Sequence, residues 1–361
     1  MAAIPLSGSL WILWLYDVSE EIDLDALRKI LGVQARREPS IRHLSPEYVR
    51  FERPPVVQRL DPVLLDGGSR FEGELNYYEY GVVSIKLELP FQADWPQLID
   101  LSCQWINNAD LEARAAEAVR RNLKEVQSAM VKLHDTWLSE DYYIVHLKET
   151  QPPSGAVALI AEHGNEIARI VRGEQAQLSP GETEEILGSR LSYYPGDLLV
   201  VGWTAAFIHD TAEGAAPTIQ LLEYANTQLL EFRYYDAILS RLLKDVYHSL
   251  EKKGGFFGRW RLASQAEHLN KIRLDIRELT ERVDTSIKFL SDMFSARLYH
   301  LAAAKVGVED YRRLVDGKLN TAGELYEFMM DQFHQSRGFV LELLVVIILI
   351  IELVFLFRGR G

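Results

Sequence analysis

The residue types that most often do chemistry in enzymes are scattered along this chain of 361 residues. No two of its nine histidines lie three to five residues apart, so the spacing of a metal-ligand pair on a helix is missing. Cys103 is the single cysteine, which excludes an intramolecular disulfide and a cysteine-based zinc cluster. The glycine motifs for phosphates, dinucleotides and a nucleophile elbow are also absent from the sequence. We therefore predict a protein that is not an enzyme, with no catalytic residues, no cofactor and no metal site.

The remaining reactive groups have simple structural explanations. Cys103 shares an apolar helical face with Leu98 and Trp105, which favours a buried structural thiol. Asp197, after Pro195-Gly196, is typical of a turn. Three glutamates that follow Pro180-Gly181 are typical of the acidic first turn of a helix: Glu182, Glu184 and Glu185. Three more alternate with apolar residues and indicate the solvated face of a strand: Glu72, Glu74 and Glu79.

Charge is distributed unevenly along the chain. The whole sequence has 39 Lys and Arg against 52 Asp and Glu, a net charge of -13. Residues 1–216 hold 19 basic against 33 acidic residues, so almost all of the excess belongs to them. Because nucleic-acid binding proteins gain affinity by neutralising phosphates, we expect no direct DNA binding.

The first 216 residues alternate short strand and helix patterns, which predicts one α+β globular domain. We expect a mostly antiparallel sheet with helices on one face. Strands are expected at residues 10–16, 48–52, 77–89, 142–147, 191–194 and 198–208, and helices at 23–31, 94–107 and 110–133.

Residues 217–337 change character and favour long helices. Apolar residues recur at three-and-four spacing over residues 218–253, and again from residue 269 to Gly307, a natural terminator. A third helical pattern begins at Tyr311, and we expect a break in this helix near residues 316–320. We predict a stalk of long antiparallel helices resembling a coiled coil, either a hairpin or a three-helix bundle.

Residues 338–357 form the most apolar segment, and residues 358–361 a short basic tail. Seventeen of the twenty residues are Leu, Ile, Val or Phe, and twenty helical residues span roughly 30 Å, the thickness of a bilayer core. The sequence therefore predicts one C-terminal transmembrane helix. With no signal peptide recognised, we expect a single-pass anchor in the cytoplasmic membrane, membrane lipid as a partner, and most of the chain on the cytoplasmic side.

Three polar residues accompany this segment: Arg337, Glu342 and Glu352. The glutamates reach the headgroup region, contact other copies in an oligomer, or line an ion path. A second candidate site is the loop between the first two stalk helices, where basic and aromatic residues alternate. It is either a solvated turn, a membrane-surface contact or a contact with RNA or a protein partner. Its residues are Lys252, Lys253, Phe256, Phe257, Arg259, Trp260 and Arg261.

Several segments together resemble one known family, the domain-of-unknown-function 155 proteins, also called "required for meiotic nuclear division 1". They are YDVSEEIDLDALRKIL (16–31), YYEYGVVSI (77–85), LLEYANTQLLEFRYYD (221–236), and Arg337 with Leu341-Glu342 and Glu352. The tail departs from the eukaryotic pattern, because no Trp follows Glu342. The resemblance implies a bacterial-type, membrane-anchored homo-oligomer without catalytic residues. It also implies a protein-mediated contact with ribosomes.

These observations favour a tail-anchored scaffold or tether linked to translation at the membrane. One alternative is an oligomeric membrane channel or transporter-like protein that uses the C-terminal helices. Another is an enzyme whose chemistry resides in the α+β domain.

Overall fold

The computed structural model describes residues 5–32, 53–64, 70–106, 108–148, 155–251, 264, 266–278, 280–281 and 293–358. The chain divides into two compact units. Unit 1 comprises residues 1–234 and 283–311, and unit 2 comprises residues 235–282 and 312–361.

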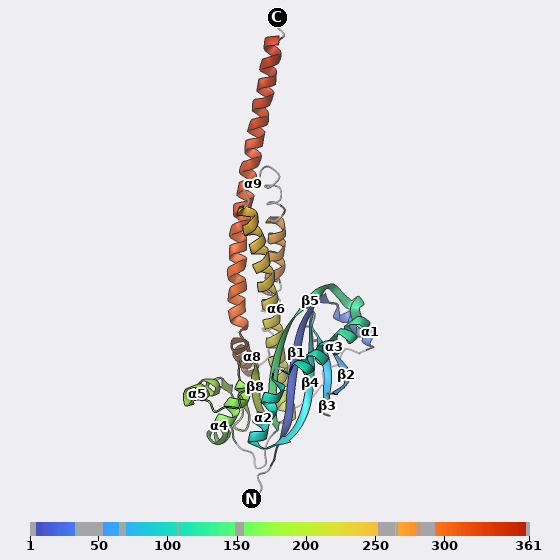
Figure 1. Ribbon diagram of the computed structural model, residues 1–361, viewed down its shortest axis with the longest axis vertical. Helices are drawn as coiled ribbons and strands as arrows, with labels where there is room; N and C mark the ends of the chain where they lie inside the picture. Colours follow the sequence, from blue (N-terminus) through green and yellow to red (C-terminus); the bar gives the residue numbers. More distant parts are fainter. Residues whose placement is uncertain are drawn as a thin grey trace. The chain divides into compact units, whose positions relative to one another are not determined.

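Unit 1 is built on one mixed sheet, whose described strands number eight in the order β2-β3-β4-β1-β5-β8-β7-β6 (Figure 1). The strands are β1 (Leu6–Ile22), β2 (Val56–Leu64), β3 (Arg70–Tyr77), β4 (Val82–Ala93), β5 (Met130–Lys148), β6 (Arg190–Leu191), β7 (Leu198–Val201) and β8 (Ala205–Asp210). All neighbouring pairs are antiparallel except β5 and β8, which run parallel. The prediction of an α+β domain with a mostly antiparallel sheet is confirmed.

Five helices pack around one face of this sheet. They are α1 (Leu24–Leu31), α2 (Trp95–Trp105), α3 (Ala109–Val126), α4 (Ala156–Arg172) and α5 (Pro180–Gly188). Alternate residues of β1 point into the core that these helices close, among them Ile12 and Trp14. Period-two alternation places such residues on a single face.

The other face of the sheet is also covered, so the expectation of helices on one face was wrong. The intervening residues of β1, Leu13 and Leu15, are fully buried as well. The cover is the first part of α6 (Ala212–Glu251), joined by α8 (Met293–Val306). A central strand that is apolar on both faces requires a layer on each side.

Local sequence explains where several elements begin and end. Asp23 caps α1, since its carboxylate accepts hydrogen bonds from the backbone amides of Asp25 and Ala26, 3.0 Å each. The strand expected at residues 77–89 is instead the end of β3, a turn, and β4. Gly81 allows that turn with a φ of +92°, which other residues rarely adopt.

Other boundaries differ from the predicted ones. The helix expected at 110–133 ends at Val126, because residues from Met130 onward pair with β1. The strand expected at 198–208 is a hairpin, since the chain reverses at Gly202 between β7 and β8. The third stalk helix is not divided near residues 316–320: α9 runs unbroken from Val308 to Arg358, and Asn320 lies within it.

Unit 2 consists of helical segments that pack side by side and have their own core (Figure 1). The later part of α6, residues 266–278 and α9 contribute to it. Leu269 and Ala322 are fully buried in this core, and Arg273 lies close against Gly323. The core residues are Leu243, Val246, Ala266, Leu269, Ala322 and Met329.

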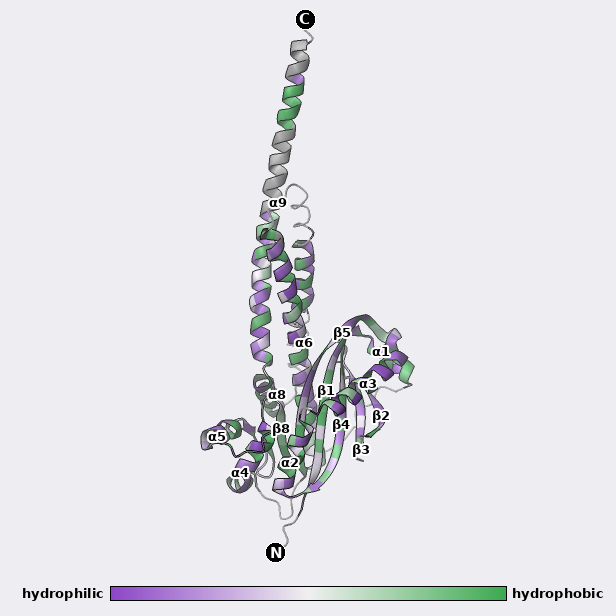
Figure 2. Cartoon of the chain, viewed as in Figure 1, coloured by the Kyte–Doolittle hydropathy of each residue, from purple (hydrophilic) through white to green (hydrophobic). Residues whose placement is uncertain are grey.

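The prediction of a transmembrane helix at residues 338–357, and of a tail anchor, was wrong. Residues 338–357 are part of α9. Among the residues that the structure describes, no helix is long and apolar enough to cross a membrane. The side chains of Val345–Ile351 (green in Figure 2) are exposed along α9.

Candidate binding pocket and buried polar network

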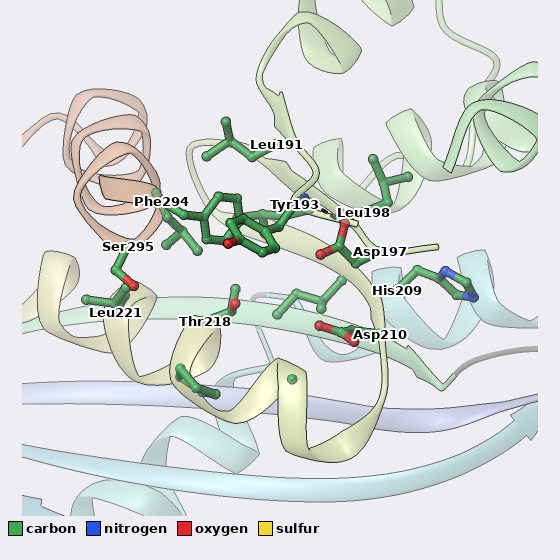
Figure 3. Close-up of a pocket in the computed structure, with 15 residues that line it drawn as sticks. Leu191, Tyr193, Asp197, Leu198, His209, Asp210, Thr218, Leu221, Phe294 and Ser295 are labelled. Carbon is green, nitrogen blue, oxygen red and sulfur yellow. Dashed lines mark hydrogen bonds between the residues drawn. The ribbon is translucent and has the colours of Figure 1, made fainter. Parts of the chain in front are cut away.

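A small pocket opens in unit 1 between the β7–β8 hairpin, the start of α6 and α8 (Figure 3). Its volume is about 40 Å³, enough for a few water-sized groups. In the close-up, Phe294 and Ser295 lie on one side and Asp197 and Asp210 on the other, with the Tyr193 ring between them. The pocket therefore combines aromatic rings with carboxylates.

Asp197 is held in one orientation by the loop that precedes β7. Its Oδ1 accepts hydrogen bonds from the backbone amides of Tyr193 (2.8 Å) and Tyr194 (3.0 Å), and from the hydroxyl of Ser192 (2.9 Å). The turn role predicted for Asp197 is therefore confirmed. All of these hydrogen bonds end on the same carboxylate oxygen.

A second concentration of polar groups is buried between α6 and the sheet. Glu223 of α6 is 1% exposed, and its Oε1 accepts a hydrogen bond of 2.7 Å from the amide of Asn76 on β3. The other carboxylate oxygen lies 3.6 Å from the ammonium of Lys86 on β4. Lys86 also pairs with Glu74, at 2.6 Å. Hydrogen bonds and ion pairs among these side chains therefore link β3, β4 and α6 to one another.

The surroundings of this network shift several proton affinities. Burial lowers the pKa of the Lys86 ammonium, but the carboxylates of Glu223 and Glu74 outweigh burial, so the pKa lies above its usual value. Burial, with the nearby Glu223 carboxylate, raises the pKa of the Tyr78 hydroxyl well above its usual value. Lys86 thus stays charged and Tyr78 neutral, which suits a structural network better than proton transfer.

The same face of α6 makes two more hydroxyl contacts. The hydroxyls of Tyr80 and Thr227 are 2.7 Å apart. The hydroxyl of Tyr299 on α8 donates to the side-chain oxygen of Gln228. Polar residues recurring every three or four positions on α6 therefore face the interior.

A chain of three groups lies farther along the same face. The hydroxyl of Tyr234 is 3.0 Å from Nε2 of His134 on β5, and Nδ1 of His134 is 3.2 Å from the buried carboxylate of Asp17 on β1. Burial lowers the pKa of His134, but its interactions with Asp17 outweigh this and raise it, while burial raises the pKa of Asp17. The His134 ring therefore lies between the Tyr234 hydroxyl and the Asp17 carboxylate.

A shift in strand register brings Asp17 and His134 together. The pairing of β1 with β5 shifts between Asp17 and Ser19, so extra residues of β5 stand opposite one residue of β1. Such bulges re-aim side chains. The arrangement could not be read from spacing, because the two residues are more than a hundred positions apart.

Most of the predicted site residues lie outside the part of the chain that the structure describes. The loop from Lys252 to Arg261 lies outside the described residues, as do the side chains of Arg337 and Glu342. Glu352 lies in α9 and is exposed. These sites remain predictions.

The acidic groups and the cysteine occupy ordinary positions. Glu182, in the first turn of α5, follows the N-cap Ser179, whose hydroxyl accepts from its backbone amide. Glu72 is exposed and pairs with Arg70. Cys103 is half-buried against the core of unit 1, and burial raises the pKa of its thiol. A solvated face explains Glu72, but it does not explain Glu74, which pairs with the buried Lys86.

The sequence carries one signal for the buried network, a polar stripe on α6. Glu223, Thr227 and Glu231 recur every four residues of α6, which is one face of a helix. Such a stripe usually indicates a solvated face, whereas all three side chains are buried. Only the packing of α6 on polar residues of β3 and β4 distinguishes the two cases.

Comparisons with known proteins find one family and one distant relative. The family described as "Uncharacterized protein MJ0711, N-terminal domain" matches residues 7–216. The uncharacterized protein MJ0711 of Methanocaldococcus jannaschii is 20% identical over 230 residues, which cover 64% of this chain and 70% of the relative. No solved structure matches.

Proposed function

The chain belongs to the family of the MJ0711 N-terminal domain, and we propose that it is a non-enzymatic scaffold that joins a folded domain to a helical arm. The observation that carries this proposal is α6. This helix of 40 residues is unbroken, and it contributes residues to both units, with the division at Tyr234 and Tyr235.

The two parts of α6 are held by different interactions. In unit 1, Glu223 and Thr227 bind partners on the sheet side. In unit 2, Leu243 and Val246 are buried against the other helices. Each unit therefore uses a part of α6 in its own packing, as expected of a scaffold that joins a folded domain to a helical arm.

The finer parts of the proposal rest on the sequence resemblance. They are membership of the domain-of-unknown-function 155 family, self-association, and a protein-mediated contact with ribosomes. The acidic balance of residues 1–216 supports contact through ribosomal proteins rather than RNA.

The test separates the two units without removing either. A Gly-Gly-Ser-Gly insertion between Tyr234 and Tyr235 interrupts α6 at the division. The matched control places the same insertion between Ala176 and Gln177, two exposed residues in the loop after α4. Tagged full-length proteins are cross-linked in cells and purified with and without RNase, and the products are identified by mass spectrometry.

We expect the wild type and the control to retain stoichiometric partners or further copies of the chain, cross-linked through both units. The α6 insertion should lose this assembly although both units still fold. An assembly that survives the α6 insertion unchanged contradicts the proposal. So does a wild-type chain that purifies without any partner or second copy.

A further inference from the structure

The pocket between the β7–β8 hairpin, α6 and α8 carries a charge that the scaffold role does not require. Asp197 and Asp210 both line it, and no Lys or Arg is among the described residues of its wall. The positive end of α6 lies nearby, and the carboxylate of Asp210, which accepts a hydrogen bond of 2.6 Å from the Thr211 amide, offsets it. The remaining charge at the pocket is negative.

The Asp197 carboxylate is prepared to bind a further group. Its three hydrogen bonds from the surrounding loop all end on Oδ1. Within the part of the chain that the structure describes, Oδ2 therefore has no donor. A carboxylate that is already oriented binds a cation without a further ordering cost.

The aromatic wall favours the same kind of ligand. The rings of Tyr193 and Phe294 meet edge to face, with centroids 5.0 Å apart and planes at 66°. Aromatic faces attract cations through their quadrupoles, by about 0.5–1 kcal/mol at exposed sites, and Tyr193 is 43% exposed. Two rings beside the oriented Asp197 carboxylate therefore suit an organic cation.

A hydroxyl on the pocket wall provides an independent observation. Thr218 of α6 lines the pocket and is only 9% exposed. Among the described residues, no hydrogen bond satisfies its side chain. Its hydroxyl is reached from the pocket, so a ligand there is able to donate a hydrogen bond to it.

We propose that this pocket binds a primary ammonium group. The ammonium donates to Oδ2 of Asp197 and to the hydroxyl of Thr218, and the rings of Tyr193 and Phe294 contact its first carbons. The volume of about 40 Å³ accepts an ammonium with a carbon or two. The group belongs either to a free polyamine or to a lysine side chain of a partner.

Isothermal titration of the full chain with n-butylammonium chloride tests the chemistry, with n-butanol as the uncharged analogue at constant ionic strength. Asp197→Asn keeps the Oδ1 acceptor of the loop and removes the charge. Thr218→Val removes the hydroxyl at nearly constant volume. Asp61→Asn, an exposed carboxylate on β2, is the matched control.

We expect saturable binding of butylammonium and none of butanol. Asp197→Asn should weaken it at least tenfold and Thr218→Val severalfold, while Asp61→Asn leaves it unchanged. Equal affinities for the wild type and Asp197→Asn, in proteins with the same melting temperature, overturn the proposal. So does the absence of saturable binding.

Two further ligands separate the sources of the ammonium group. Tighter binding of spermidine than of butylammonium supports a free polyamine, and tighter binding of an acetyl-Gly-Lys-Gly-amide peptide supports a partner lysine. Cross-linking tests the scaffold proposal on which this inference rests, and titration tests ammonium binding. A failure of one proposal is therefore distinguishable from a failure of the other.

Discussion

Replacement of Glu223 by alanine tests whether the buried network fixes α6 to the sheet. The carboxylate is 1% exposed, accepts from Asn76, and lies 3.6 Å from the ammonium of Lys86. Removing one partner of a buried ion pair costs about 3–5 kcal/mol, because the other charge stays buried. Lys86 keeps Glu74 at 2.6 Å, which limits the loss, so we expect about 3 kcal/mol.

Two further variants are compared with Glu223→Ala for their loss of unfolding free energy. Glu223→Gln retains an acceptor for Asn76 but loses the charge, and should cost about 1–2 kcal/mol, the difference between a charged and a neutral hydrogen bond. Glu72→Ala removes an exposed ion pair on β3 and should cost less than about 1 kcal/mol.

Guanidinium unfolding followed by tryptophan fluorescence provides the assay. Six of the seven tryptophans belong to unit 1, so the signal reports the unit in which Glu223 is buried. If Glu223→Ala costs no more than Glu72→Ala, the network does not hold α6 in place. If Glu223→Gln loses as much unfolding free energy as Glu223→Ala, then the hydrogen bond to Asn76 that Gln retains does not contribute to stability as we expect.

Three further predictions concern other parts of the chain. Because the pKa of His134 is raised from 6.5 in the folded protein, its contribution to stability is complete below that value and is lost as pH rises through the folded pKa. Unit 1 should melt at lower temperature as pH increases above about 6.5, with a smaller pH dependence in His134→Gln. Leu269→Ala should destabilise unit 2 by about 2–5 kcal/mol in thermal unfolding, since Leu269 is fully buried, and a loss below about 1 kcal/mol would show a loose core. Gly81→Ala should cost more than about 1 kcal/mol, because φ is +92° and a Cβ would clash with the Ser19 carbonyl; an unchanged melting temperature would exclude this turn geometry.

Local patterns determined much of the secondary structure of this protein. Asp23 and Gly307 mark a helix start and a helix end where the sequence predicts them, because capping and left-handed geometry depend on a few neighbouring residues. Alternating apolar residues predicted a strand within β1 and another within β5, and the longer apolar seam predicted most of α6.

Tertiary structure decided which polar residues are buried and which residues meet. Glu223 follows a pattern that on most helices faces water, and it is buried because Asn76 and Lys86 lie opposite it. Asp17 meets His134 only through a register shift between β1 and β5. The apolar character of residues 338–357 suggested a membrane helix, but apolar composition alone does not determine what a helix packs against. Pairing across a sheet depends on contacts far apart in sequence, and no local pattern of residue types records them.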